Sequence, residues 1–146
     1  MTAIRSSLLV SLVAMTMLVG CGGDKGPTAA EALQHLKGDV NALLAEINAT
    51  NVKVTDDGSR VVRCRDNKIK RIYAATATKP SQGYDRYGLV TLMIGAKRDE
   101  YKLVQPKTAT TPAVVRNRAA RTSMTLDSPV SGVLTIQGST DCLRSG

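Results

Sequence analysis

The chain contains no tryptophan and no phenylalanine, and tyrosine occurs only four times in its 146 residues. Proteins that bind sugars or single-stranded nucleic acids usually stack those ligands on aromatic side chains, so this composition argues against both classes of binding protein. A hydrophobic core must be largely aliphatic, and the 42% of residues that are hydrophobic are enough to build one. We expect one globular domain without a nucleic-acid partner.

Histidine is equally scarce, because His35 is the only one. A serine nucleophile normally needs a base held beside it, and the chain contains no Gly-x-Ser-x-Gly motif. The adjacent carboxylates Asp99 and Glu100 would point to opposite faces of a strand. We expect no catalytic residues, no cofactor and no enzyme activity. A small hydrolase of the cell envelope is the alternative, and a deep cleft that gathers two carboxylates, or a carboxylate and His35, would favour it.

The sequence also contains no recognisable set of metal ligands. A structural zinc site needs about four ligands, and no cysteine lies at ligand spacing from His35. Its neighbours Gln34 and Lys37 are polar, so the imidazole is expected at the surface of a helix, beside the apolar stripe. We therefore predict no metal site and give His35 no role as a ligand.

No hydrophobic run is long enough to cross a membrane as a helix, which takes about 20 apolar residues. The run at residues 8–19 is broken by Ser11 and Thr16, and Arg5 precedes it. A positive charge, a short apolar run and a small residue at its end are typical of an export signal. We predict that residues 1–20 form such a signal.

The end of this segment, Leu18-Val19-Gly20-Cys21, resembles the lipobox of bacterial lipoproteins. The resemblance implies that diacylglycerol is attached to the sulfur of Cys21 and that the chain is cleaved after Gly20. Two acyl chains give stable anchoring in a membrane, whereas one chain binds only marginally. An ordinary secretory signal with an incidental cysteine is the alternative.

The segment after the lipobox predicts a short tether. Residues 21–27 comprise the lipidated cysteine and a glycine-rich stretch, and six extended residues reach only about 20 Å. A folded domain at residues 28–146 would then lie close to the extracytoplasmic face of the membrane.

Two cysteines remain beyond Cys21, namely Cys64 and Cys142. An even pair in an exported protein predicts a disulfide, because the compartment is oxidising. Closing so long a loop would stabilise the fold by about 4 kcal/mol in the chain-entropy description. Two buried free thiols are the alternative.

Basic residues outnumber acidic ones, and the net charge is +8. One basic stretch, residues 60–71, contains Asp66 as its only acid, and a second basic group comprises Arg116, Arg118 and Arg121. We predict that the first stretch contacts an anionic membrane surface or an acidic partner. A solvated strand face is the alternative. The basic residues of this stretch are Arg60, Arg63, Arg65, Lys68, Lys70 and Arg71.

The apolar pattern predicts a helix followed by three strands. Thr28 and Glu31 have the spacing of a capping box, and apolar residues at helical spacing continue to Ile47. Asp56-Asp57-Gly58 separates two β-prone runs, which predicts a hairpin there. A third strand is expected at residues 68–78.

Residues 85–98 fit either a buried strand or a helix. We predict a helix, because apolar residues recur at positions i, i+3, i+4 and i+7 and the basic Lys97 and Arg98 suit a helix C-terminus. Helices and strands do not alternate regularly, so the fold class is α+β, with an antiparallel sheet and one or two helices packed on one face. The remaining strands are expected at residues 101–104, 113–116, 122–126 and 133–137.

Together with the lipobox, several loose motifs resemble small cell-envelope lipoproteins of actinobacterial type. The resemblance implies an architecture and a location at the cell membrane, but no reaction. The matching segments are Arg63-Cys64-Arg65, Lys70-Arg71-Ile72-Tyr73, Tyr101-Lys102-Leu103-Val104 and Gly138-Ser139-Thr140-Asp141-Cys142.

These observations lead to one functional hypothesis. The chain is expected to be a membrane-anchored extracytoplasmic lipoprotein that acts as a non-enzymatic binding or accessory module of the cell envelope. Its partners would be the membrane, through the lipid, and an envelope protein or ligand that the sequence does not identify. The alternatives are the small hydrolase and a purely structural envelope protein, which a broad flat apolar surface would favour.

Overall fold

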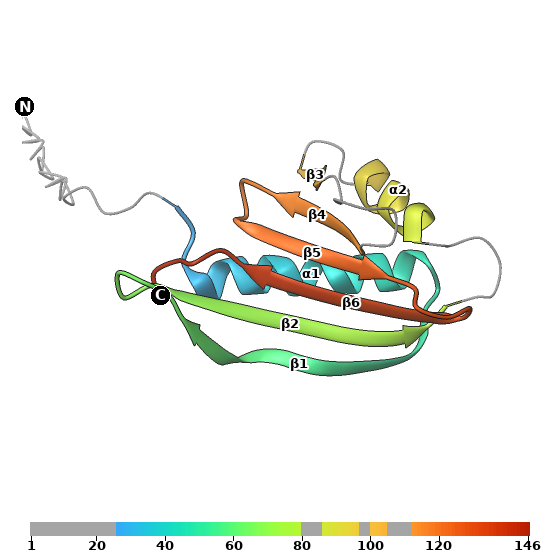
Figure 1. Ribbon diagram of the computed structural model, residues 1–146, viewed down its shortest axis with the longest axis horizontal. Helices are drawn as coiled ribbons and strands as arrows, with labels where there is room; N and C mark the ends of the chain where they lie inside the picture. The colour runs from blue at the N-terminus through green and yellow to red at the C-terminus, as the bar shows by residue number, and fades with distance from the viewer. Residues whose placement is uncertain (1–25, 80–85, 97–99, 105–111) are drawn as a thin grey trace, which may run out of the picture.

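The computed structural model describes residues 26–79, 86–96, 100–104 and 112–146. Within these residues, two helices and six strands form an α+β fold, as predicted (Figure 1). In chain order they are α1 (Ala29–Glu46), β1 (Thr50–Arg63), β2 (Ile69–Thr78), α2 (Arg86–Ala96), β3 (Tyr101–Val104), β4 (Ala113–Asn117), β5 (Thr122–Asp127) and β6 (Val133–Thr140).

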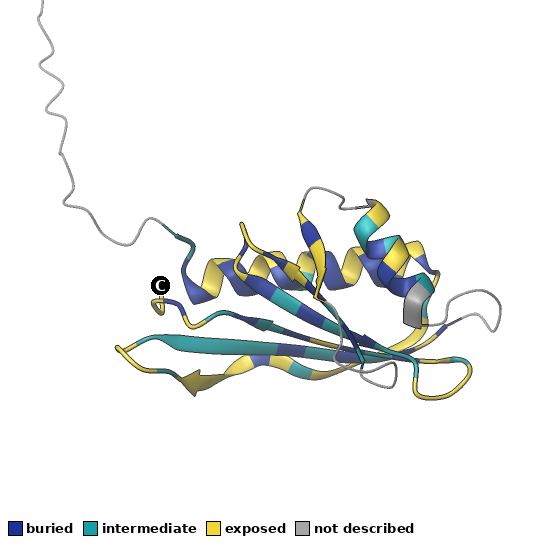
Figure 2. Ribbon diagram, turned by 45° about the horizontal axis from the view of Figure 1, so that its top comes forward, coloured by how far each residue is buried: buried dark blue, intermediate teal, exposed yellow. Residues whose placement is uncertain are grey.

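All six strands belong to one antiparallel sheet with the order β1-β2-β6-β5-β4-β3. Buried residues alternate along β4, β5 and β6, and the buried set forms one core with apolar residues of both helices (Figure 2). The helix α1 contacts β2, β5 and β6, and α2 contacts β3, β4 and β5. The predicted packing of helices on one face of the sheet is therefore confirmed.

The helix α1 begins where the capping box predicted. The Thr28 hydroxyl accepts a hydrogen bond from the backbone N–H of Glu31, and the Glu31 carboxylate accepts one from the backbone N–H of Thr28 at 2.8 Å. These two bonds satisfy donors that have no partner within the helix.

The helix α1 approaches the sheet closely at Gly138 on β6. A Cβ atom at this position would lie 2.5 Å from Cδ1 of Leu36, whose side chain is fully buried. The missing side chain of Gly138 therefore makes the room that Leu36 fills.

The prediction of a hairpin at Asp56-Asp57-Gly58 is wrong. The strand β1 continues through these residues, and a bulge lies between the pairs Asp57–Tyr73 and Val61–Arg71. Gly58 has a φ of 84°, and glycine with positive φ occurs in some bulges as well as in hairpin turns. The same sequence signal therefore serves a bulge here.

The turn between β1 and β2 lies instead at residues 65–68. Asp66 and Asn67 both have positive φ, 59° and 56°, and the backbone N–H of Lys68 donates to the carbonyl of Arg65. Two central residues of positive φ are the mark of a two-residue hairpin turn of type I′. The sequence did not indicate this turn, because Asp-Asn lacks the glycine that usually signals one.

The predicted disulfide is present between Cys64, directly after β1, and Cys142, just after β6. Next to it, Ile69 and Leu143 pair as an isolated antiparallel bridge. These links hold the β1–β2 turn against the C-terminal segment.

Candidate functional sites

Four segments far apart in the sequence meet at the end of the molecule where α1 begins (Figure 1). The side chain of Arg144 donates to the carbonyl of Gly26 at 3.2 Å, and the backbone N–H of Ala29 donates to the carbonyl of Arg144 at 2.8 Å. The β1–β2 turn joins them through the disulfide, and the β4–β5 turn joins through the bond from Asp141 N–H to the Arg121 carbonyl. The predicted export signal at residues 1–20 and Cys21 lie outside the described residues.

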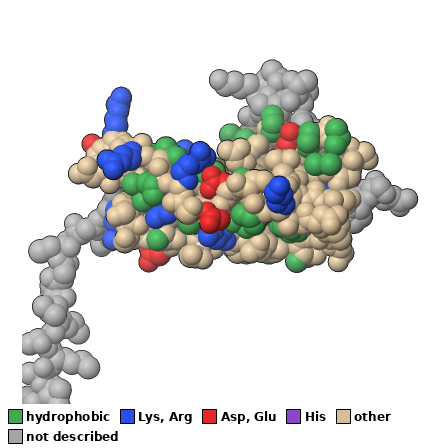
Figure 3. Space-filling model, turned by 90° about the horizontal axis from the view of Figure 1, so that it is seen from below, with side chains coloured by type: hydrophobic (Ala, Val, Ile, Leu, Met, Phe, Trp, Pro, Cys, Tyr) green, Lys and Arg blue, Asp and Glu red, His purple; other side chains and the backbone are tan. Residues whose placement is uncertain are grey.

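This end, which we call the basic end, collects cations from both basic groups of the sequence. Figure 3 views the β1 side of the molecule, and Lys and Arg side chains gather toward this end, where a few acidic side chains also lie. The sequence did not indicate that the two groups would meet, although the pairing of Cys64 with Cys142 is consistent with it. The basic residues are Arg63, Arg65, Lys68 and Lys70 near the first turn, Arg116, Arg118 and Arg121 near the second, and Arg144.

The arginines of the β4–β5 hairpin are arranged around one carboxylate. Asp141 accepts hydrogen bonds from the guanidinium groups of Arg116 at 2.9 Å and Arg121 at 2.8 Å. With Arg118 these residues line a shallow depression of about 270 Å³. Three guanidinium groups and one carboxylate leave a net charge of +2 in this depression, which favours anions.

Two residues of the predicted basic stretch serve the bulge of β1 instead. Arg60 pairs with Asp56 at 3.2 Å, and Arg71 donates to the backbone carbonyls of Gly58 and Ser59 at 3.0 and 3.2 Å. Their contacts stabilise the chain where it departs from regular pairing. The structure therefore divides the stretch into four cations at the basic end and two at the bulge.

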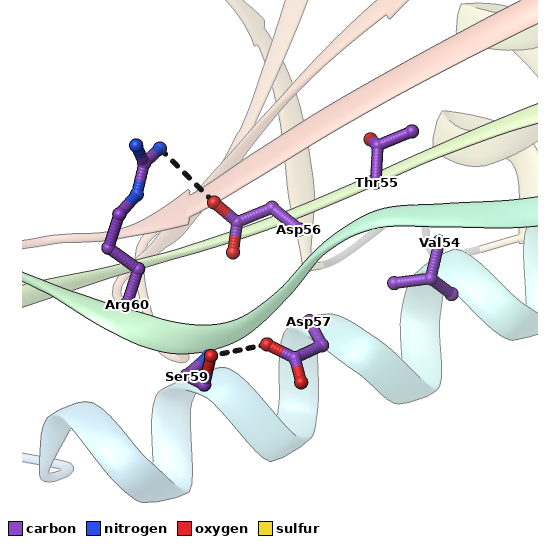
Figure 4. A pocket seen from close by; sticks show the side chains of 6 residues that line it. All are labelled: Val54, Thr55, Asp56, Asp57, Ser59 and Arg60. Carbon is purple, nitrogen blue, oxygen red and sulfur yellow. Dashed lines mark hydrogen bonds and ion pairs between the residues drawn. The ribbon is translucent and has the colours of Figure 1, made fainter.

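The bulge itself borders a shallow hollow of about 600 Å³ (Figure 4). Asp56 and Arg60 lie on one side of the strand, whereas Asp57 and Ser59 lie on the side that faces α1. Hydrogen bonds from the side chain and backbone of Ser59 lower the pKa of the Asp57 carboxyl. These polar groups bond one another rather than converge on a common point, so the hollow is a poor candidate for a ligand site.

A second cluster forms around Asp39, where α1 meets β3. His35 and Asp39 are one turn apart on α1, and Nδ1 of His35 lies 3.1 Å from Oδ2 of Asp39. The hydroxyl of Tyr101 donates to the same oxygen at 2.6 Å. Asp39 and Tyr101 are buried, whereas the His35 side chain is 48% exposed. The imidazole therefore links a buried carboxylate to solvent.

Glu100 completes this cluster. Asn117 on β4 donates to Oε2 of Glu100 at 3.3 Å. One ligand-type atom from each of His35, Asp39 and Glu100 lies within 4.8 Å of the others. We call these three residues the His–Asp–Glu cluster. Asp99, which the sequence analysis paired with Glu100, lies outside the described residues.

Electrostatics keep Tyr101 a donor in this cluster. Burial raises the pKa of its phenol well above the ordinary value, and the hydrogen bond to Asp39 and the charge of that carboxylate raise it further. Glu100 acts in the same direction. The phenol therefore stays protonated at neutral pH and holds the Asp39 carboxylate in place.

The exposed side of His35 borders a shallow pocket of about 300 Å³ between the start of α1 and the β4–β5 turn. Its lining contains one other ionisable residue, Glu31, and no serine, threonine or cysteine. The sequence could have linked His35 to Asp39 by their helical spacing, but not to Glu100, which lies far along the chain, just before β3. The lining residues are Pro27, Glu31, Ala32, His35, Ala119 and Ala120.

Comparison of the chain with models of protein families, with curated proteins and with solved structures finds no match. Within the described residues, no helix is both long and apolar enough to cross a membrane. Function must therefore be argued from the sites themselves.

Proposed function

We propose that the chain is a membrane-anchored extracytoplasmic lipoprotein, a non-enzymatic binding module whose basic end rests on the anionic membrane surface. The observation that carries the proposal is the contact between Arg144 and Gly26 within a group of cations from distant parts of the sequence. Gly26 is five residues from the predicted lipidated Cys21, so the anchor would emerge at the most basic end.

Geometry and charge act together in this arrangement. An extended tether of six residues spans about 20 Å, which keeps the basic end within reach of lipid headgroups. Each basic side chain near an anionic membrane contributes on the order of 1 kcal/mol, and salt screens the attraction. The acids Glu31, Asp66 and Asp141 reduce the sum.

Such an orientation leaves the sheet accessible to a partner. Both described helices pack on one face, and on the other face β2, β5 and β6 carry mostly small and polar side chains. They are Ile72, Ala74 and Thr76 on β2, Ser123 and Thr125 on β5, and Thr135, Gln137 and Ser139 on β6.

The two alternatives receive less support. For a hydrolase, the pocket beside His35 is shallow, and its lining offers no hydroxyl or thiol nucleophile. For a purely structural protein, a broad apolar face is needed, but the exposed valines of β1 are divided between the two faces of the sheet. Val54 and Val61 pair with residues on the helix side, and Val62 pairs with Lys70 on the other.

The anchor is tested by replacing Cys21→Ala in cells supplied with a labelled fatty acid. We expect the label and the membrane association to be lost in the variant and present in the unchanged chain. A variant that still carries the label would overturn the proposed anchor.

The orientation is tested with the chain from residue 22 onward, which contains every described contact but no lipid. It is mixed with vesicles of neutral lipid alone or with vesicles that also contain about 30% anionic lipid. We expect binding only to the anionic vesicles, with loss at high salt. Replacing Arg63, Lys70 or Arg118 with Gln, one at a time, should weaken binding. Lys53→Gln on the distant part of β1 is the matched control, and equal weakening by it would refute the orientation.

A further inference from the structure

We propose that the His–Asp–Glu cluster binds a divalent transition-metal ion of the Zn²⁺ type. The proposal rests on two residues of α1 and on Glu100, just before β3, and does not depend on the lipid anchor. The ligands would be Nδ1 of His35 and one carboxylate oxygen each from Asp39 and Glu100.

The distances suit a single ion. Zinc binds imidazole nitrogen and carboxylate oxygen at about 2.0–2.2 Å, so tetrahedral ligand atoms lie about 3.4 Å apart. His35 Nδ1 and Asp39 Oδ2 are already 3.1 Å apart, and all three ligand atoms lie within 4.8 Å. Small rotations of the His35 and Glu100 side chains would complete the geometry.

The cluster is supported from behind by other side chains. Tyr101 donates to Asp39 from the buried side, and Asn117 donates to Glu100. Outer hydrogen bonds of this kind orient metal ligands and contribute strongly to affinity. Because Asp39 is buried and hydrogen-bonded before any ion arrives, part of the site is preorganised.

The open side of the cluster gives the ion a route. The His35 side chain is 48% exposed and borders the shallow pocket at the start of α1. Three protein ligands leave a fourth tetrahedral position, which water can occupy.

The ligand types select among cations. A nitrogen ligand favours zinc and neighbouring transition metals, whereas Ca²⁺ and Mg²⁺ prefer six or more oxygen ligands. Two carboxylates and one imidazole therefore favour Zn²⁺ over both of the abundant alkaline-earth ions.

The experiment uses the full chain without a histidine tag, purified in detergent and stripped of metal with a chelator. Zn²⁺ is titrated in competition with a chromophoric chelator. We expect one Zn²⁺ per chain, with little competition from Ca²⁺ or Mg²⁺. His35→Gln and Glu100→Gln should each weaken binding at least tenfold. Glu46→Gln, at the exposed end of α1, removes the same charge as Glu100→Gln and should bind like the unchanged chain.

Because His35 is the only histidine, proton NMR gives a direct second readout. Its imidazole C–H resonances should shift as Zn²⁺ is added and should not shift with Mg²⁺. Thermal unfolding of each variant in the absence of metal verifies that it is folded. The proposal is overturned if the chain binds no Zn²⁺, if the His35 resonances do not move, or if the ligand variants bind as tightly as Glu46→Gln.

Discussion

The phenol of Tyr101 on β3 donates a 2.6 Å hydrogen bond to Oδ2 of Asp39 on α1, and both residues are buried. This bond connects the first helix to the strand at the far edge of the sheet. A buried carboxylate is costly unless it is hydrogen-bonded, so this pair is important for stability as well as for the proposed metal site.

We expect Tyr101→Phe to lower the free energy of unfolding by about 1–3 kcal/mol, because it removes a donor from the buried Asp39. Chemical denaturation measures the change. Tyr73→Phe is the matched control, since Lys37 lies over the Tyr73 ring, 5.6 Å from its centroid, and the ring is retained. A double-mutant cycle with Asp39→Ala isolates the pair. No coupling between the two substitutions would contradict the bond's role.

Because Gly138 lies against Leu36, replacing glycine with alanine should change the stability in opposite directions at Gly138 and at Gly38. Gly138→Ala places a Cβ against the buried Leu36 and should destabilise the fold by about 1–3 kcal/mol. Gly38→Ala, in α1, meets nothing within 4 Å and should stabilise the fold by up to about 1 kcal/mol through helix propensity. Urea denaturation compares the two. Destabilisation by both substitutions would argue against the close approach of α1 and β6.

Loss of the Cys64–Cys142 disulfide should lower stability by about 4 kcal/mol, because the bond closes a long loop over a sequence separation of 78. Denaturation before and after reduction measures the loss. Mass spectrometry of protein alkylated without reduction should find both cysteines unmodified. Two alkylated thiols would show that the pair is not joined in the purified protein.

Glu31 should contribute to acid sensitivity. Hydrogen bonds from the backbone and side chain of Thr28 lower the pKa of the Glu31 carboxyl from its ordinary value of 4.5. A lowered folded-state pKa gives stability that is present above about pH 4.5 and is lost as the pH falls through the folded value. Glu31→Gln should reduce this loss, while Glu46→Gln should leave it unchanged. The midpoint of urea denaturation, followed from neutral to acid pH, makes the comparison. Because the pKa of Asp57 is also lowered, part of the loss of stability in acid should remain in both variants.

Local features of the chain were predicted well where they depend on near neighbours. The capping box at Thr28 and Glu31 starts α1, and the segment that fitted both a strand and a helix is helical from Arg86 to Ala96. Helical periodicity favoured the right assignment there. Residues 97–98, the predicted basic end of that helix, lie outside the described residues.

The bulge in β1 was missed for a physical reason. Asp-Asp-Gly has side chains that accept from the following backbone N–H groups, and Gly58 allows positive φ, so the segment suits a turn and a bulge alike. In the structure, β1 pairs with β2 on both sides of this segment, and Gly58 also makes room for Leu33, because a Cβ at Gly58 would lie 2.6 Å from its side chain. That contact exists only once α1 packs on the sheet.

By itself, the sequence determined the helix start, the strand alternation and the α+β class, because these follow from spacing along the chain. It predicted the Cys64–Cys142 pair only together with the expectation that Cys21 is lipidated. Only the tertiary structure decided which distant residues meet. His35 lies near Glu100, and Arg144 contacts Gly26. Both pairs meet because the antiparallel order of the strands brings the ends of β1 and β4 and the C-terminus to the end of the molecule where α1 begins. Contacts of that range depend on how whole elements pack, and no local pattern of residues encodes them.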